Sequence, residues 1–306
     1  SFIILFLFTI IPKNDLRKIL NILALFFLIL LILVPILGYE VKGATRWLNF
    51  KFFSIQPSEL LKGPIICMFS WFCYLYIKTN KLLYLLINFF LMMIIISFLL
   101  LQPDIGTLLL YLSIFALLLI LYFKNLKLFF LLFVIGIIFI ITAYFSFDHV
   151  QSRVDNFLFS ENTQVSKSIS AIKEGGLFGV GLGEGQLKYS IPESHNDFIF
   201  AILIEEFGLI FGLFIVFLYP AFFIIAKYSY SGSSNLFIEN TTFCLCFILC
   251  IQAFINIGSS INLIPPTGMT LPFISYGGSS MLSYAFIFGT VINFLKNEEG
   301  PSNNTS

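Results

Sequence analysis

The chain has 306 residues, of which 58% are hydrophobic and 11% are charged, and its net charge at pH 7 is +1. Soluble domains carry about 25% charged residues, so this composition indicates an integral membrane protein. The near-neutral charge, without a basic face, argues against nucleic acid or another polyanion as a partner. Two histidines are too few for a histidine-built metal site. The cysteines all lie in apolar runs without a CxxC spacing, which is typical of small hydrophobic side chains.

Apolar runs of about 20 residues recur along the chain, which favours membrane-spanning helices over the short alternating strands of a barrel. We expect eight full spans, at 19–37, 57–77, 82–101, 104–123, 128–147, 197–226, 240–263 and 273–295. The apolar run at 1–11 is too short to span, and we interpret it as the end of a truncated helix. The prediction is an all-α, polytopic membrane bundle that forms one domain over 1–306.

Polar segments separate these runs. Residues 12–18 are expected to form a turn, and 38–56 an amphipathic loop with aromatic side chains at the membrane interface. Residues 148–196 form the one long polar segment, and a loop of that length is usually functional or disordered. We predict a large outer loop with partial order there, and a disordered tail at 297–306.

Basic residues set the expected orientation. If the spans alternate, the turns at 12–18, 78–81, 124–127, 227–239 and 296–306 fall on one side. Lysine and arginine are about twice as dense there as on the other side. The denser side should face the cytoplasm, which places 38–56, the long loop and Asp197 outside.

The stretch from Gly175 to Glu206 carries the most unusual chemistry. A glycine-rich run leads through a polar turn to Asp197, which lies at the start of an apolar span. An acid where water meets hydrocarbon is a functional candidate, although Asp is also a preferred helix N-cap. Glu205 and Glu206 follow at a depth of about two helical turns, so we expect them to contact another helix.

Further polar groups occur at the same predicted side. Glu59 and Lys62 are three residues apart on one helix face, so they can simply neutralise each other or line a polar cavity. Asp104 follows Pro103 at a helix start, where an N-cap is the simpler role. Arg46 lies in the loop nearby.

Two segments are rich in small residues. The glycines at 175–185 have a spacing similar to the GxGxxG pattern of dinucleotide-binding sites. No strand or βαβ unit precedes them, so tight packing is the better interpretation. The hydroxyl-rich segment 265–280 could hold a pyrophosphate or a sugar through its backbone and side chains. Close helix packing explains its small residues equally well.

Six motifs in order along the chain carry a family resemblance. They are Glu40–Trp47 (EVKGATRW), Gln56–Lys62 (QPSELLK), Gln102–Thr107 (QPDIGT), Gly175–Gly183 (GGLFGVGLG), Pro192–Phe200 (PESHNDFIF) and Leu271–Ser279 (LPFISYGGS). Together they resemble the SEDS family of cell-division and elongation proteins, the FtsW/RodA group. The stretches Gln252–Gly258 and Pro266–Pro272 are more similar to the division branch.

The resemblance implies a peptidoglycan glycosyltransferase that polymerises lipid II outside the bacterial cytoplasmic membrane, at the division septum. The essential acid of the family falls on Asp197, and its functional charged positions fall on Arg46, Glu59 and Lys62. A carboxylate near the acceptor hydroxyl is the natural general base. We predict further substrate contacts at His195, Ser275, Gly277, Gly278 and Ser279.

No cofactor is certain, but a divalent cation, Mg²⁺ or Mn²⁺, could offset charge on the leaving pyrophosphate. The resemblance also implies a single-pass class B penicillin-binding protein as partner, with other divisome proteins. Two rival hypotheses remain open. A lipid II flippase should place charged groups along a path across the membrane. A non-catalytic scaffold would make Asp197 dispensable.

Overall fold

The computed structural model describes residues 1–41, 44–51, 53–159, 163–191, 194–230 and 235–296. The predicted disordered tail at 297–306 therefore lies outside the described residues, as do Phe52 and the start of the polar turn before Asp197.

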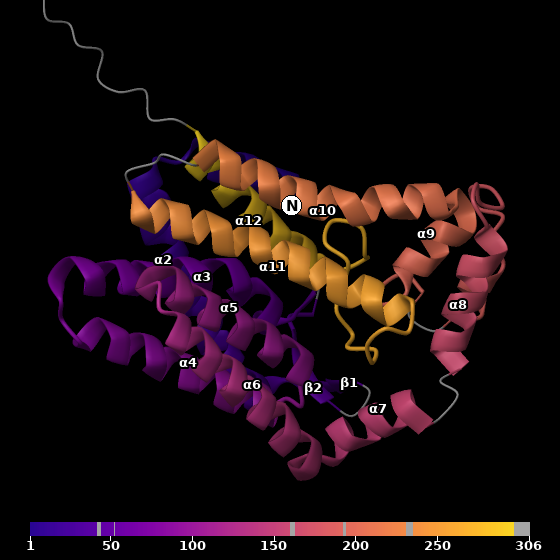
Figure 1. Ribbon diagram of the computed structural model, residues 1–306, viewed down its shortest axis with the longest axis horizontal. Helices are drawn as coiled ribbons and strands as arrows, with labels where there is room; N and C mark the ends of the chain where they lie inside the picture. The colour runs from indigo at the N-terminus through magenta and orange to yellow at the C-terminus, as the bar shows by residue number, and fades with distance from the viewer. Residues whose placement is uncertain (42–43, 52, 160–162, 192–193, 231–234, 297–306) are drawn as a thin grey trace, which may run out of the picture.

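Eight helices in the described parts of the chain are long and apolar enough to span a membrane. They are α2 (Lys13–Leu37), α3 (Pro57–Thr79), α4 (Leu83–Leu101), α5 (Ile105–Phe123), α6 (Leu126–Ser146), α10 (Leu209–Tyr230), α11 (Leu236–Ser260) and α12 (Gly278–Leu295). The predicted polytopic helical bundle is confirmed, and Figure 1 shows these helices packed side by side.

Shorter elements complete the fold. The helices are α1 (Phe2–Ile10), α7 (Asp148–Phe159), α8 (Thr163–Gly175), η1 (Leu187–Tyr189) and α9 (Ile199–Phe207). The strands β1 (Tyr39–Val41), β2 (Ala44–Asn49) and β3 (Ser54–Ile55) pair antiparallel in the order β1-β2-β3. Trp47 on β2 pairs with Tyr39, and Leu48 pairs with Ile55.

Burial identifies the centre of the bundle. In the most apolar 18-residue stretch of each helix, 72% of the α11 residues and 67% of the α3 residues are buried, against 6% of the α6 residues. Helix α3 contacts α2, α4, α5, α11 and α12, so it is the hub of the core. The five cysteines are buried and unpaired among these helices, as predicted. Because α6 exposes apolar side chains over most of its surface, it suits a lipid-facing position.

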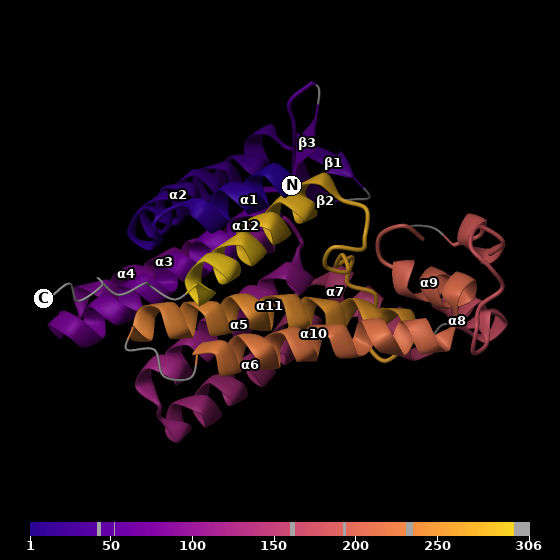
Figure 2. The same ribbon diagram turned by 90° about the horizontal axis from the view of Figure 1, so that it is seen from above.

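The two ends of the bundle differ in chemistry. We call one the lysine-rich end, with basic residues at Lys13, Arg17, Lys18, Lys78, Lys81, Lys124, Lys127, Lys227 and Lys296. There the Nζ of Lys13 donates to the carbonyl of Lys296, 2.7 Å away, which ties the start of α2 to the end of α12. Figure 2 shows β1–β3 and α7–α9 toward the opposite end, which we call the sheet end. Which end faces the cytoplasm remains a prediction.

Two expectations for the first part of the chain are wrong. Residues 12–18 do not form a turn, because α2 begins at Lys13 with Asp15 in its first turn. An acid there complements the positive helix end, and Lys18 pairs with it at 3.0 Å. The segment 38–56, expected to be an amphipathic loop, contains the three strands of the small sheet, and the exposed rings of Phe50 and Phe53 stack beyond the end of β2. In the long segment 148–196, the described residues include the helices α7, α8 and η1, so the predicted order is confirmed for these parts.

The predicted span at 197–226 is also wrong, because the chain breaks at Gly208 between α9 and α10. Gly208 has φ +87° and ψ 169°, a conformation essentially restricted to glycine. Its backbone lies directly against the backbone of Leu177–Gly179. The amides of Val180 and Gly181 donate to the carbonyls of Glu205 and Glu206, at 2.9 and 3.2 Å. The glycine-rich run thus satisfies the open carbonyls at the end of α9.

This close approach generates a prediction for Gly179, which has φ +82°. A methyl group there would collide with the carbonyl of Glu206. We expect Gly179→Ala to destabilise the protein by at least about 1 kcal/mol, from the positive φ alone. It should also speed hydrogen exchange at the Val180 and Gly181 amides.

The matched control is Gly136→Ala on α6, where an added methyl group meets nothing within 4 Å. Its melting temperature should stay the same or rise, because alanine favours helix. Equal melting temperatures and exchange rates for the native protein and Gly179→Ala would contradict this packing.

Candidate functional site

The site is built around the short turn that carries Asp197 into α9. Asp197 lies two residues before the first residue of α9, and Phe198 holds the N-cap position, so the alternative that Asp197 is the N-cap is wrong. Its side chain is half-buried. The conformation of the turn therefore depends on contacts from elsewhere in the chain.

Helix α11 supplies the first of these contacts. The Nδ2 of Asn256, which is 1% exposed, donates to the carbonyls of Asp197 at 3.1 Å and Met269 at 2.7 Å. The carbonyl of Asn196 also lies 3.4 Å from this nitrogen. One buried amide thus joins the turn to the segment that follows α11.

The segment between α11 and α12 supplies the second contact. Ser275 Oγ donates to the Asn196 carbonyl at 2.7 Å and accepts from the Leu271 amide. The amide of Tyr276 donates to the carbonyl of His195 at 3.0 Å. Three consecutive backbone carbonyls at 195–197 are therefore bonded by two separate elements, which fixes the start of α9.

A polar cavity of about 290 Å³ opens beside this turn. Its wall brings together residues from the sheet, from α3, from the turn and from the start of α12, including Arg46, Glu59, Asp197, Gly277, Ser279 and Ser280. Gly268, with φ +78°, lies so close that an added methyl group would contact the carboxylate of Asp197 at 3.9 Å. Acidic, basic and hydroxyl side chains thus share one space at the sheet end.

Arg46 on β2 is held by the turn between α4 and α5. Its Nε donates to the carbonyl of Gln102 at 3.1 Å, and Nη2 donates to that of Pro103. Nη1 lies 3.8 Å from the carboxylate of Asp104. Asp104 itself caps α5 by accepting from the Thr107 amide, as predicted. A guanidinium has five donors, so Arg46 keeps hydrogen-bonding capacity toward the cavity.

Glu59 connects the cavity to a buried polar chain. Lys62 Nζ donates to Glu59 Oε1 at 2.6 Å and to Gln252 Oε1 at 3.2 Å. Gln252 Nε2 then donates to the Tyr284 hydroxyl at 2.7 Å and lies 3.2 Å from the carbonyl of Thr270. The predicted pairing of Glu59 with Lys62 is confirmed. Lys62 is fully buried and is not among the residues that line the cavity.

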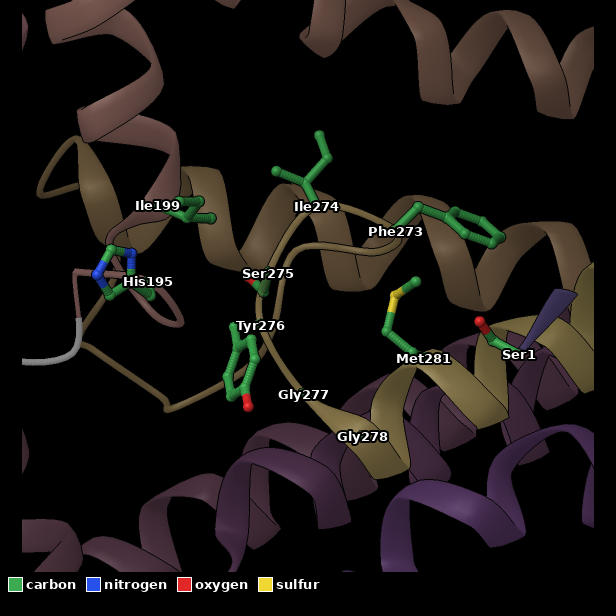
Figure 3. Close-up of a pocket in the computed structure, with 10 residues that line it drawn as sticks. All are labelled: Ser1, His195, Ile199, Phe273, Ile274, Ser275, Tyr276, Gly277, Gly278 and Met281. Carbon is green, nitrogen blue, oxygen red and sulfur yellow. The ribbon is translucent and has the colours of Figure 1, made fainter. Parts of the chain in front are cut away.

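The remaining predicted residues lie at a second, larger cavity of about 740 Å³. His195, Ser275 and Gly278 line it with apolar side chains such as Phe273 and Met281. Figure 3 shows the His195 ring at one end of this space and Met281 toward the other. Tyr276 and Gly277 line both cavities, so the two spaces adjoin along one short segment.

Glu205 and Glu206 do not make the helix-to-helix contact expected of them. Glu205 Oε1 accepts from the Leu187 amide at 2.9 Å, and Glu206 pairs with Lys188 at 2.7 Å. The break at Gly208 places both acids beside the glycine-rich loop rather than inside a long span. Lys188 Nζ donates this hydrogen bond to Glu206, and the bond raises the pKa of Lys188 above its ordinary value.

Sequence reasoning missed Gln252 and Asn256. A signal was present, because two amide side chains stand one helical turn apart in the otherwise apolar stretch 243–257, where polar groups are expected to have partners. Within the described residues, no three His, Cys, Asp or Glu side chains form a cluster suited to a metal ion.

Comparison with known proteins decides the family. The family model for FtsW, RodA and SpoVE, described as a cell cycle protein, matches residues 1–300. The chain belongs to this family. A protein of Caulobacter vibrioides named probable peptidoglycan glycosyltransferase FtsW is 34% identical over 98% of this chain and 78% of the relative. Stage V sporulation protein E of Bacillus subtilis is 32% identical over 88% of this chain and 76% of the relative.

Solved structures support the SEDS fold. A chain from a peptidoglycan synthase complex matches 96% of this chain and 85% of its own length, with a TM-score of 0.78 and 21% identity. Thermus thermophilus RodA matches 96% of this chain and 82% of its own length, with a TM-score of 0.65 and 23% identity. This member of the SEDS family is therefore a multi-pass membrane protein with the fold of its relatives.

The buried Glu59–Lys62 pair generates a stability prediction. Glu59→Gln leaves the Lys62 ammonium buried without its counter-charge, which should destabilise the protein by about 3–5 kcal/mol. Asp15→Asn breaks the exposed pair with Lys18, which has the same spacing, and should cost about 0–1 kcal/mol. Thermal unfolding in detergent measures both.

Adding Lys62→Met to Glu59→Gln removes the orphaned charge and should recover most of the lost stability. If the double variant were no more stable than Glu59→Gln alone, the buried charge would not be the cause.

The Lys188–Glu206 pair gives a pH dependence. Because the folded state raises the pKa of Lys188 above 10.5, the pair stabilises the protein at lower pH and loses this effect as pH rises through the raised value. Near neutral pH the native protein should have a higher melting temperature than Lys188→Gln. The difference between the two melting temperatures should shrink above pH 10.5. A difference that grows with rising pH would contradict the pairing.

Proposed function

We propose that this protein is a peptidoglycan glycosyltransferase that polymerises lipid II. Its relatives in Caulobacter vibrioides and Wigglesworthia glossinidia are named probable peptidoglycan glycosyltransferases. The observation that carries the proposal is the placement of Asp197 on a cavity shared with a guanidinium, a second carboxylate and several hydroxyls. That set matches a reaction in which a sugar hydroxyl is deprotonated and a pyrophosphate leaves.

In the proposed reaction, Asp197 is the general base. Its carboxylate accepts the proton of the acceptor sugar's 4-hydroxyl as that oxygen attacks the anomeric carbon of the donor. A new glycosidic C–O bond forms, and the bond between the anomeric carbon and the pyrophosphate oxygen breaks with inversion. Undecaprenyl pyrophosphate leaves with the bonding electrons. The bonds from Asn256 and Ser275 hold the turn, so the carboxylate is positioned before substrate binds.

Hydrogen-bond donors must stabilise the negative charge that develops on the leaving pyrophosphate. Arg46 keeps free N–H capacity, and Ser279 and Ser280 line the same cavity. A divalent cation could serve the same purpose, because carboxylate oxygens are the ligands that Mg²⁺ prefers. Asp197 and Glu59 are the residues that would hold it, and Glu59 Oε2 is buried without a hydrogen-bond partner. Such an ion would neutralise the leaving group.

The second cavity suits the lipid side of the substrate. It adjoins the polar cavity at Tyr276 and Gly277, and Ile199, Phe273 and Met281 make its wall largely apolar. We propose that the first isoprenyl units lie here, with His195, Ser275 and Gly278 near the pyrophosphate. The polyprenyl tail could then remain in the bilayer while the sugars meet water.

The placement of Glu205 and Glu206 favours this enzyme over the flippase. A transporter needs polar groups near the midplane of the membrane. Both acids instead bond to the loop around η1 at the sheet end, together with Asp197 and Arg46. We further propose that the protein acts at the division septum with other divisome proteins. A single-pass class B penicillin-binding protein would cross-link the strands as its partner.

Lipid II polymerisation by the purified protein with its transpeptidase partner tests the proposal. Asp197→Asn should lower the rate by about 10²–10⁴-fold, the usual contribution of a general base. Asp155→Asn, a half-buried acid on α7 bonded to the Tyr144 hydroxyl, is the control and should polymerise normally.

Equal polymerisation by the native protein and Asp197→Asn would remove Asp197 as the base. If neither form polymerised while lipid II crossed the bilayer, the flippase would be the better hypothesis. Normal septal cell wall synthesis by cells carrying Asp197→Asn would favour the scaffold.

A further inference from the structure

A separate cavity of about 220 Å³, with both polar and apolar side chains in its wall, lies at the lysine-rich end, where α5, α10 and α11 meet. Lys227 in the last turn of α10 and Glu239 in the first turn of α11 both line it, and both side chains are exposed. One positive and one negative group therefore face a single space, far along the bundle from Asp197. In Figure 1, α11 lies between α10 and α5.

Two buried side chains in this cavity each leave one polar atom without a hydrogen-bond partner. Asn240 is 6% exposed and Thr242 is 2% exposed, and neither Asn240 Nδ2 nor Thr242 Oγ1 is bonded. The intervening Thr241 has its hydroxyl bonded to Ser70 and to the carbonyl of Phe237, at 2.6 Å each. Buried donors without partners are unfavourable, so the two that line the cavity point to an acceptor-bearing ligand.

An apolar groove of about 360 Å³ continues from this cavity along the same three helices. Phe223 and Phe243 line both spaces, and their rings pack edge to face with centroids 4.7 Å apart. Beyond them the groove is lined by apolar side chains, among them Leu117, Phe247 and Ile251. A charged, hydrogen-bonding head joined to an apolar channel is the shape of a lipid site.

We propose that this site binds one phospholipid with a primary-amine headgroup, phosphatidylethanolamine, from the leaflet at the lysine-rich end. The phosphate oxygens accept hydrogen bonds from Lys227, Asn240 Nδ2 and Thr242 Oγ1. The ammonium group donates to Glu239, and one acyl chain lies in the groove. One cation and one anion match a zwitterion, and the carboxylate disfavours a headgroup with net negative charge.

A transmembrane helix of a partner protein is the other class of occupant. An apolar helix would cover the groove, but it would leave the donors of Asn240 and Thr242 unsatisfied and both charges unmatched. The polar groups of this headgroup cavity therefore favour a lipid over a helix as the occupant. The site shares no residue with the cavities beside Asp197, so this proposal stands apart from the proposed function.

Native mass spectrometry of the purified protein in detergent tests the proposal with phosphatidylethanolamine, phosphatidylglycerol and phosphatidylcholine of identical acyl chains. Phosphatidylethanolamine should bind about tenfold more tightly than either other lipid, the gain expected from a charge-assisted bond to Glu239. Glu239→Gln should remove most of the preference over phosphatidylcholine.

The double variant Asn240→Leu/Thr242→Val deletes the phosphate donors and should weaken phosphatidylethanolamine binding about tenfold or more. Thr290→Val is the matched control. Thr290 is equally buried on α12, and its hydroxyl donates to the Phe286 carbonyl, so lipid binding should not change. Melting temperatures show whether each variant is folded. Ile251→Trp, which fills the groove without touching the headgroup cavity, replaces the double variant if that one does not fold.

Unchanged lipid binding in the folded variants, or tighter binding of phosphatidylglycerol than of phosphatidylethanolamine, would overturn the proposal. A photo-reactive residue at Phe247 in intact membranes separates the two classes of occupant. It should yield lipid adducts, and cross-links to another membrane protein without lipid adducts would assign the groove to a helix instead.

Discussion

The side-chain amide of Asn256 donates to the carbonyls of Asp197 and Met269, at 3.1 and 2.7 Å, and the geometry of the site depends on this contact. Asn256 stands on α11, the most buried of the spanning helices, so it shares the rigidity of the core. Asp197 precedes a helix of nine residues that would not be stable alone. The position of the acid is therefore set by the bundle rather than by its own local sequence.

A second constraint is electrostatic. Burying Lys62 in an apolar bundle is unfavourable unless an anion and hydrogen-bond acceptors accompany it. Glu59 and Gln252 supply both, and Tyr284 extends the chain to α12. The network joins α3, α11 and α12 directly beneath the cavity. It therefore fixes Glu59, which lines the cavity, relative to α11, the helix that bonds the turn carrying Asp197.

The glycine-rich run shows how local backbone freedom serves the same site. Gly208 allows the chain to end α9 and begin α10 in a direction that a continuous helix could not take. The amides of Val180 and Gly181 satisfy the carbonyls at that break. The long loop is thereby packed against α9, and Glu205 and Glu206 of α9 bond to the Leu187 amide and to Lys188.

Most of the spans could be predicted from sequence, because hydrocarbon allows long apolar helices and little else. The α9–α10 break could not, because Gly208 stands in an apolar run and its role depends on the distant glycines 176–181. The small sheet was missed because β1 and β3 are too short for an alternating pattern. Motif resemblance brought Arg46, Glu59 and Asp197 together, whereas Gln252 and Asn256 needed the tertiary contacts to reveal their roles.

The most direct measurement is an experimental structure of the protein with its partner and a non-reactive lipid II analogue. The acceptor 4-hydroxyl should lie within about 2.6–3.2 Å of the Asp197 carboxylate, the reach of a general base. Arg46 should then lie beside the donor pyrophosphate. An acceptor sugar held away from Asp197, with the polar cavity between the sheet and α12 left unoccupied, would contradict the central claim.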